Sequence, residues 1–519
     1  MIKALLSLAF IIVLYSCRRD ISPIPPIPPI TTPAVLVISQ DEIKLNPTGF
    51  APLSAVVNYS YPTVGKTKII VFGKNGANSN IEHVFNDNGS SHSVPIIGLY
   101  PNYKNTVEIL LTNDKGDSLA KAFINIQTGA LPVGMPTSII TDSAQYANME
   151  PGLNLVSSFS NSNPYIPYMT DHYGDIRWLL DYTTHPDLDS LSYDDGISRL
   201  KNGNFYFGDE TTSKIYEVDL LGKVVNSWGL SGYIFHHEVQ EKPNGNFLIS
   251  ATNPSSTSTN GTLTIEDYVI EIDRRTGGIV YTWDLKESLD ENRLVMYAEE
   301  RDWMHINALF YDSSDNTIIV SGRMQGVVKL SYDNKVKWIL GPHKDWGKNR
   351  RGENLNPFLL TPLDARGNKI TDTLMLNGNK NHPDFEWSWF QHSPTLMPNG
   401  DLLLFDNGWR RNFNGADTDP YSRAVEYKID PVKMTVRQVW QYGKERGIET
   451  YSRIVSNVQF LPKSNHVLFC PGFQVANSRG KGGKVVEVDY ATGKAVFQSS
   501  ISSQNLWGFH RTTRMSAYP

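Results

Sequence analysis

Residues 235–250 read FHHEVQEKPNGNFLIS, and residues 390–405 repeat the pattern as FQHSPTLMPNGDLLLF. Each stretch joins two apolar strands by a Pro-Asn-Gly turn, and the spacing from His237 to Asn244 equals that from His392 to Asn399. A third unit places His305 before the turn at 314–316 in nearly the same register. Repetition at this scale indicates one supersecondary unit that recurs along the chain.

The repeat continues beyond the hairpin. An alternating third strand such as residues 268–273 follows, and then a short strand that ends in an aromatic residue. The six ends are Trp178, Trp228, Trp283, Trp338, Trp440 and Phe497. Four strands per unit, at a period of about 50 residues, predict a six-bladed β-propeller. The first unit lacks an opening strand, and we expect residues 506–511 to supply it and close the ring.

Length and charge agree with a large globular body. The chain has 519 residues, of which 40% are hydrophobic, and a formal net charge of −5. It can therefore bury a large core. Because nucleic-acid binding requires a basic stripe, we expect no nucleic-acid partner.

Residues 34–130 do not follow the propeller repeat. Short strands at 34–38, 66–72 and 106–111, with Asn-Gly and Lys-Gly turns between or after them, predict a small β-sandwich of the immunoglobulin or fibronectin kind. Nothing in this part suggests catalysis. The expected fold is all-β, with a sandwich at 34–130 and a catalytic propeller at 131–519.

The N-terminus indicates export. Residues 4–15 are almost wholly apolar but too short to span a bilayer, and they lead into Leu14-Tyr15-Ser16-Cys17, which resembles a bacterial lipobox. We predict a signal peptide at 1–17, lipidation of Cys17 and a semi-rigid Pro-rich tether at 18–33. The protein would be anchored to a bacterial membrane, and we expect the outer one, on its periplasmic or surface side. The alternative is an ordinary secretory signal in which Cys17 is incidental.

The second cysteine, Cys470, lies in an apolar stretch at 467–470. A buried structural thiol is the expected reading, rather than a catalytic one. If Cys17 is lipidated, no intrachain disulfide can form.

The histidines are expected to meet at one mouth of the propeller channel. His237, His305 and His392 open the innermost strands of their units. The second strand of each unit returns to the same mouth, so Arg323, at the end of its strand, should lie close to His305.

A long connection, residues 341–390, separates two of these units. Long loops in compact domains are often functional, so we expect it to lie over the mouth as a lid or rim. Its Trp346 or Trp387 would then stack on a ligand or pack in the core.

Three histidines and an arginine permit several chemistries. Three imidazoles can bind zinc and leave one position open. Imidazoles and a guanidinium can instead hold a tetrahedral oxyanion, with one histidine as nucleophile. Against metal, the arginine would repel a dication, and the sequence shows no evident carboxylate ligand. Purely structural hydrogen bonding is the remaining reading.

Four motifs together resemble the bacterial arylsulfate sulfotransferases. They are Asp302-Trp303-x-His305-x-Asn307, Ser321-x-Arg323, Gln391-His392 and Phe405-Asp406-Asn407-Gly408. The resemblance covers residues 33–519 and implies a secreted six-bladed propeller behind a small β-sandwich. It implies transfer of a sulfuryl group from an aryl sulfate donor to a phenolic acceptor, without the nucleotide donor PAPS and with no cofactor or metal.

The resemblance also implies roles for single residues. The catalytic set is His392, His305, Arg323 and His237, and the substrate-binding set is His236, Asn307 and Asn407. His392 would be the nucleophile that forms a sulfohistidine in a ping-pong reaction, and His305 with Arg323 would bind the sulfuryl group. Repeat register selects His237 over His236, which strand alternation should point off the opposite face.

Some members of that family have a disulfide near the active-site mouth. A chain lipidated at Cys17 cannot form it, so its lid must be organised differently.

Two other functions stay open: a metal-dependent propeller hydrolase or lyase that uses the same histidines, and a non-enzymatic ligand-binding lipoprotein. The sequence does not set the oligomeric state, and a homodimer is one option.

Overall fold

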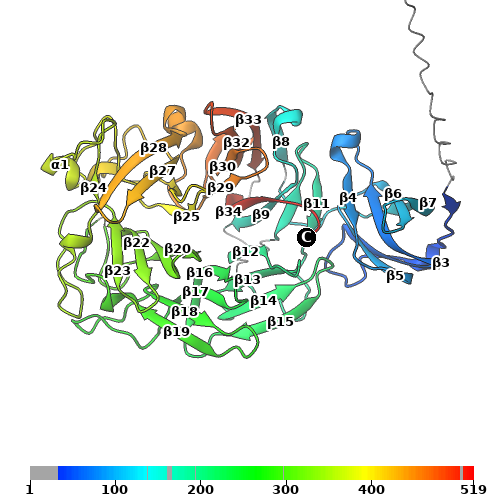
Figure 1. Ribbon diagram of the computed structural model, residues 1–519, viewed down its shortest axis with the longest axis horizontal. Coiled ribbons are helices and arrows are strands. Elements are labelled where there is room, and N and C mark those ends of the chain that lie inside the picture. Colours follow the sequence, from blue (N-terminus) through cyan, green and yellow to red (C-terminus); the bar gives the residue numbers. More distant parts are fainter. Residues whose placement is uncertain (1–32, 137, 161–165, 193–194, 296, 503–505) are drawn as a thin grey trace, which may run out of the picture.

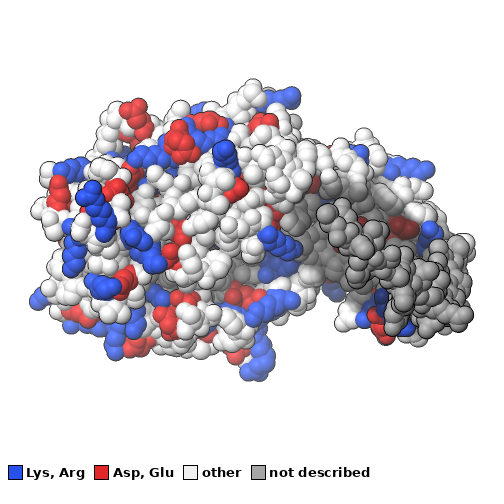
Figure 2. Space-filling model, turned by 45° about the horizontal axis from the view of Figure 1, so that its top comes forward, with Lys and Arg blue, Asp and Glu red and all other residues white. Residues whose placement is uncertain are grey.

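The computed structural model describes residues 33–519, except 137, 161–165, 193–194, 296 and 503–505. The predicted signal peptide, the lipidation site Cys17 and all but the last residue of the tether lie outside the described residues. Within the described part of the chain, no helix is long and apolar enough to cross a membrane. On the face shown in Figure 2, acidic and basic side chains are interspersed.

The N-terminal sandwich is built around one long strand. Its strands are β1 (Ala34–Val35), β2 (Ile43–Leu45), β3 (Ser54–Val71), β4 (Ile81–Val84), β5 (Gly89–Ile97), β6 (Lys104–Thr112) and β7 (Ser118–Gln127). The first half of β3 pairs with β2 and β5, and its second half pairs with β4 and β6. Burial alternates along β6 and much of β7, as expected for strands with one face on a core. The predicted β-sandwich is confirmed.

Six further sheets of the described chain form the propeller (Figure 1). Blade 1 contains β34 (Leu506–Met515), β9 (Leu153–Ser160), β10 (Tyr168–Thr170) and β11 (Ile176–Leu179), from the channel outward. Blade 2 contains β12 (Asp195–Arg199), β13 (Phe205–Asp209), β14 (Lys214–Val218) and β15 (Val224–Gly229). Blade 3 contains β16 (Ile234–Glu241), β17 (Phe247–Thr252), β18 (Tyr268–Ile272) and β19 (Ile279–Asp284).

Blade 4 contains β20 (Ile306–Asp312), β21 (Thr317–Gly322), β22 (Gly326–Ser331) and β23 (Val336–Leu340). Blade 5 contains β25 (His392–Leu396), β26 (Leu402–Asp406), β27 (Arg423–Asp430), β28 (Thr435–Tyr442) and the added β24 (Thr361–Pro362). Blade 6 contains β29 (Asn457–Leu461), β30 (His466–Cys470), β32 (Gly480–Asp489), β33 (Lys494–Ser502), the added β8 (Ser138–Ala144) and β31 (Val475–Asn477). The short helices are α1 (Thr373–Leu376) and 3-10 turns at Gln40–Glu42, Ala77–Ser79, Tyr146–Asn148, Leu285–Glu287, Asn356–Phe358, Arg411–Phe413 and Lys444–Thr450.

The aromatic ends of the repeat connect neighbouring blades. They all lie in the outermost of the four regular strands of a blade, as predicted. Four of their indole N–H groups donate to backbone carbonyls of the next blade: Trp178 to Leu220, Trp228 to Arg274, Trp283 to Ser331 and Trp440 to Tyr490. A buried indole needs an acceptor for its N–H, and the turn of the next blade supplies one.

The ring is closed at two places. The C-terminal β34 pairs with β9 and becomes the innermost strand of blade 1, which confirms the predicted closure. In addition, β8 pairs with β33 at the outer edge of blade 6. Blade 1 therefore contains a strand from the C-terminal end of the propeller sequence, and blade 6 contains one from its N-terminal end.

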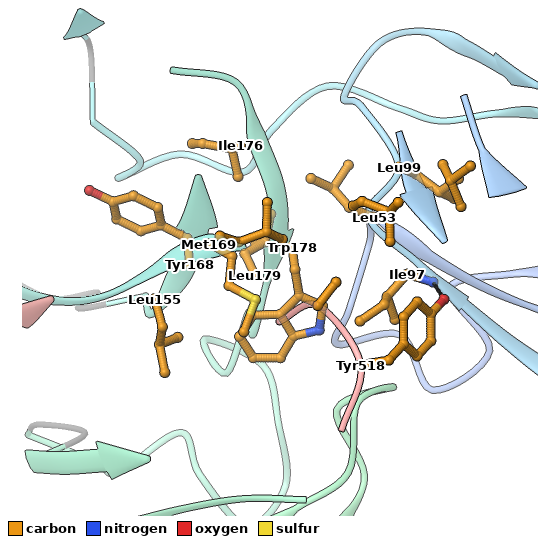
Figure 3. Close-up of a cluster of buried hydrophobic side chains, with 14 of the residues drawn as sticks. Leu53, Ile97, Leu99, Leu155, Tyr168, Met169, Ile176, Trp178, Leu179 and Tyr518 are labelled. Carbon is orange, nitrogen blue, oxygen red and sulfur yellow. Dashed lines mark hydrogen bonds between the residues drawn. The ribbon is translucent and has the colours of Figure 1, made fainter. Parts of the chain in front are cut away.

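The sandwich packs directly on blade 1 (Figure 3). Leu53, Ile97 and Leu99 lie in the same buried cluster as Trp178 and Tyr518. The Tyr518 hydroxyl accepts a bond from the Ile97 N–H at 2.7 Å. The two domains thus share one continuous hydrophobic core.

The insertion at 341–390 lies mainly along the outer edges of blades 4 and 5 rather than over the channel mouth, so the predicted lid is wrong. Only its last residues reach the inner strands, where the backbone N–H of Trp389 donates to Asp406. The insertion's strand β24 pairs in parallel with the outer strand β28, and α1 sits at the periphery in Figure 1. Trp346 and Trp387 are buried and donate to the carbonyls of Pro342 and Met375. The outermost strand of a blade has an unpaired edge, and this segment covers it.

Candidate active site

Register irregularities shape the inner ends of the blades. Within the described strands, β12, β16, β20, β25 and β34 each show a bulge or register shift beside a residue of the site. His237 and His305 also have positive φ values of 57° and 51°. Bulges re-aim side chains and are common next to active sites, and positive φ in non-glycine residues marks strain that such sites tolerate.

A cavity of about 470 Å³ lies at one mouth of the channel. It is lined by Phe159, Asp195, Glu210, His236, His237, His305, Arg323, His392, Trp409, Arg453, Ile454, Val455 and His510. The structure therefore brings together the four residues predicted as catalytic. His236 also lines the cavity, so its predicted outward orientation is wrong, because the shift between Phe235 and Val239 breaks strand alternation.

His392 is held in one tautomer. Its Nδ1 lies 2.8 Å from Asn407 Oδ1, while Asn407 Nδ2 donates to the carbonyls of Ser452 and Val455. Because those two bonds fix the amide orientation, Oδ1 is the acceptor and His392 Nδ1 carries the proton. Nε2 then carries the lone pair, which accepts a hydrogen bond from Asn307 Nδ2 at 3.2 Å. Burial holds the pKa of His392 well below its usual range, so the imidazole is neutral.

His305 is held by two carboxylates. Its Nδ1 lies 2.9 Å from Asp302 Oδ2 and 2.8 Å from Glu266 Oε2. Burial disfavours its charged form, but these two carboxylates outweigh burial and raise the pKa of His305 to about 9. The two carboxylates therefore favour the imidazolium form of His305.

Arg323 contacts the second ring nitrogen of His305 as a hydrogen-bond donor. Arg323 Nη1 lies 3.4 Å from His305 Nε2, and the guanidinium stacks near the rings of Phe390 and Trp409. Arg323 Nε is buried and makes no hydrogen bond to the residues that the structure describes. A buried guanidinium with an unpaired N–H group suits an oxyanion.

Carboxylates accompany the histidines, which corrects the sequence-based expectation that none is evident. Glu266 Oε2 lies 2.8 Å from His236 Nε2 as well as from His305. Three groups in the described residues could hold a metal ion: His236-His237-His305, Asp195-His237-His510 and Glu266-Asp302-His305. Glu266 and Asp302 lie outside the strands, where no periodic pattern marks them.

Sequence reasoning missed His510 and Asp195. His510 stacks on His237, with ring centroids 5.3 Å apart, and Asp195 Oδ1 lies 3.3 Å from His510 Nδ1. Mainly through burial, the pKa of His237 falls to about 4 and that of His510 to about 3. A signal existed, because Phe509-His510 repeats Phe235-His236 once the C-terminal strand is treated as an innermost strand.

An apolar wall borders the polar centre. Phe159, Trp409, Ile454 and Val455 line the cavity together with Arg453. The aromatic contact expected from Trp346 or Trp387 is not found there, because no residue of 341–390 lines the cavity in the described structure. Cys470 is fully buried in β30, as expected for a structural thiol, and burial raises the pKa of that thiol.

A cavity on a six-bladed propeller that combines imidazoles, guanidinium groups and an aromatic wall has the composition of an enzyme active site, and it suits a ligand with an anionic and an aromatic part. The comparisons with known proteins agree. The family model described as Arylsulfotransferase (ASST) matches residues 139–510, and the Arylsulfotransferase Ig-like domain matches residues 42–129. The chain belongs to the arylsulfotransferase family.

Two curated relatives match over most of their length. The arylsulfate sulfotransferase AssT of Escherichia coli O6:H1 is 28% identical over 550 residues, which covers 89% of this chain and 90% of the relative. The protein of the same name from Lelliottia amnigena is 28% identical and covers 87% and 88%.

Solved structures show weaker likeness. A Bacteroides caccae protein of unknown function is 12% identical with a TM-score of 0.42, covering 70% of this chain and 100% of that one. A virginiamycin B lyase from Staphylococcus aureus is 9% identical with a TM-score of 0.30, covering 87% and 99%. Scores this low support no conclusion about function.

Proposed function

We propose that the protein transfers a sulfuryl group from an aryl sulfate to a phenolic acceptor without PAPS, through a sulfohistidine at His392. The observation that carries the proposal is the fixed tautomer of His392, whose neutral imidazole keeps an unprotonated Nε2 in a cavity that Arg323 and His305 also line. Membership of the arylsulfotransferase family supports the substrate class.

In the first half-reaction the Nε2 lone pair attacks sulfur, an S–N bond forms, and the S–O bond to the aryl group breaks. The phenolate oxygen leaves with the electron pair. Arg323 and His305 hold the non-bridging sulfuryl oxygens, where charge is spread in the transition state. The contact from Asn307 orients the lone pair in the resting enzyme.

His305 is suited to move the proton. Its Nδ1 side is held by Asp302 and Glu266, which leaves the Nε2 proton facing the cavity. We assign that proton to the departing phenolate. In the second half-reaction His305 takes the proton of the incoming phenol, whose oxygen attacks sulfur and releases neutral His392.

The aryl groups fit the apolar wall. Trp409 and Phe159 line the cavity beside the donors, and aromatic rings gain from stacking or edge contacts with another ring. A single wall that serves both donor and acceptor in turn agrees with ping-pong exchange at one site.

We also propose that Cys17 is lipidated and that the Pro-rich segment holds the body at a bacterial membrane, for which we favour the outer membrane. The support is the lipobox-like sequence. A homodimer stays a prediction.

The test uses the purified full-length protein in detergent and chelator, with an aryl sulfate and a phenol but no PAPS. Donor cleavage should depend on the phenol and show ping-pong kinetics, and ³⁵S from a labelled donor should stay on the protein when the phenol is omitted. His392→Asn should abolish both signals, whereas His382→Asn, in a turn of the insertion, should keep them. If a wide panel of donors gives no acceptor-dependent cleavage, the proposal is wrong.

A further inference from the structure

A second constellation lies beside the sulfuryl-binding donors, on the innermost strands of blades 1, 2 and 3. It contains His510 of β34, Asp195 at the start of β12 and His237 of β16. Asp195 Oδ1 lies 3.3 Å from His510 Nδ1, and Oδ2 lies 3.8 Å from His237 Nδ1. One ligand atom from each residue falls within 4.8 Å of the others.

Three ring nitrogens of this group are buried without a hydrogen bond in the described chain. His510 is 2% exposed, and neither of its ring nitrogens makes a hydrogen bond to any residue that the structure describes. His237 Nδ1 is also buried without a hydrogen bond in the described chain. Buried polar atoms normally find a partner, and leaving one unpaired costs free energy. The partner is therefore expected to come from outside the chain.

We propose that Asp195, His237 and His510 bind a divalent transition-metal ion of the zinc class. Two imidazoles and a carboxylate are a donor set that such ions use, with a further position left for water or a ligand. Tetrahedral bonds of about 2.0–2.1 Å place neighbouring ligand atoms roughly 3.3 Å apart. The observed Asp195 distances of 3.3 and 3.8 Å are close to this spacing. The two imidazole rings are stacked at 17°, so binding requires at least one of them to turn toward the ion.

The other two candidate groups are less suited to a cation. Both include His305, whose Nδ1 already bonds to Asp302 and whose Nε2 faces the Arg323 guanidinium at 3.4 Å. A dication there would meet a fixed positive charge. Next to His510, in contrast, the charge of Arg511 is neutralised by Glu238 at 2.6 Å.

The experiment measures binding, so it does not depend on the proposed sulfuryl transfer. Chelator-treated full-length protein in detergent is titrated with Zn²⁺ against a chromophoric chelator, and with Co²⁺ while the visible ligand-field bands are followed. One ion per chain is expected. Asp195→Asn, which preserves shape, and His510→Gln should each weaken Zn²⁺ binding by at least about tenfold, with the unfolding temperature checked for each variant.

The matched controls are His236→Gln and His305→Gln, which remove imidazoles of the competing groups and should leave Zn²⁺ affinity unchanged. No saturable Zn²⁺ binding would overturn the proposal, as would unchanged affinity in Asp195→Asn. Loss of binding in the two controls, with retention in His510→Gln, would assign the ion to the other group and also overturn it. The absence of Zn²⁺ binding would not affect acceptor-dependent sulfuryl transfer measured in chelator. Failure of the metal-site proposal can therefore be distinguished from failure of the proposed function.

Discussion

His305 Nε2 and Arg323 Nη1 face each other 3.4 Å apart at the mouth of the propeller channel. Arg323 Nη1 can only donate, so in this geometry it donates to His305 Nε2, while the carboxylates at Nδ1 raise the pKa of His305 to about 9 and favour a second proton on Nε2. Once Nε2 is protonated, two cationic groups face each other, and an oxyanion that accepts from both relieves their repulsion. The pair therefore favours a bound oxyanion over an empty site.

The first prediction concerns Arg323. Arg323→Lys keeps the charge but loses the planar fork, so kcat/KM for an aryl sulfate should fall by about 10²–10³-fold. Inhibition by inorganic sulfate should weaken in parallel, because the same donors bind it. Arg437→Lys, on the outer strand β28, is the matched control and should change neither value. A variant with wild-type sulfate inhibition would contradict the assignment.

Asn407 positions the nucleophile rather than touching substrate. Asn407→Leu removes the acceptor at 2.8 Å from His392 Nδ1 and frees the imidazole to adopt the other tautomer. Rapid-quench labelling should show sulfohistidine formation slowed by about 10–100-fold with little change in donor KM. Asn407→Asp keeps an acceptor and should restore part of the rate, with an altered pH profile. An equal loss in both variants would indicate a merely structural role.

Substitutions of Trp409 and Trp346 should distinguish a residue that contacts the ligand from one that packs in the core. Trp409→Ala should raise KM for aryl sulfates by about tenfold, in line with roughly 1–1.5 kcal/mol for a lost aromatic contact. Trp346 is buried in the insertion, so Trp346→Ala should lower the unfolding temperature and leave KM unchanged. Steady-state kinetics and calorimetry on both variants provide the comparison. The reverse pattern would restore the insertion as a ligand-binding lid.

Acid stability should depend on Glu386 in blade 5. Burial disfavours its charge, but Arg423 and Arg411 outweigh burial and lower its pKa to about 2. Because the folded pKa lies below the unfolded value of about 4.5, the stabilisation is complete above that pH and is lost as pH falls toward 2. The loss amounts to roughly 3 kcal/mol.

Calorimetry between pH 6 and 3 measures this dependence. Glu386→Gln should unfold at a lower temperature near neutrality and show a shallower decline with acid, since the titrating group is gone. Glu445→Gln, an exposed residue of the same blade, should follow the wild type. Parallel pH curves for wild type and Glu386→Gln would contradict the linkage.

Membrane attachment should depend on Cys17. Cys17→Ser should move the protein from the membrane to the soluble fraction, and mass spectrometry of the wild type should find a lipidated N-terminal Cys17. Cys470→Ser changes a buried thiol and should leave fractionation unaltered. If Cys17→Ser stays in the membrane fraction, the lipobox interpretation fails.

The propeller was predictable because its determinants are local and repeated. Turn residues, alternating strands and the aromatic strand ends recur at a fixed period, and Trp178, Trp228 and Trp283 each donate to the next blade. Register also placed His305 beside Arg323, because antiparallel strands return to the same mouth. Those relations follow from strand direction and from residue spacing along the chain.

The errors arose where the backbone departs from regularity. Strand alternation sent His236 away from the cavity, but the bulge in β16 turns it inward. The insertion was assigned to the mouth on length alone, yet an unpaired edge at β28 holds it at the periphery. Neither a bulge nor a free sheet edge leaves a periodic mark in the sequence.

The sequence alone determined the repeat, the closure by residues 506–511 and the set of His237, His305, Arg323 and His392, since each depends on local pattern and strand order. Only the tertiary structure decided that Glu266 joins His236 to His305, that Asn407 sets the His392 tautomer and that His510 meets Asp195. The first and third of these contacts join residues from different blades, and the second joins the two ends of one hairpin in blade 5. Their chemistry depends on distances that only the folded blades and their packing fix.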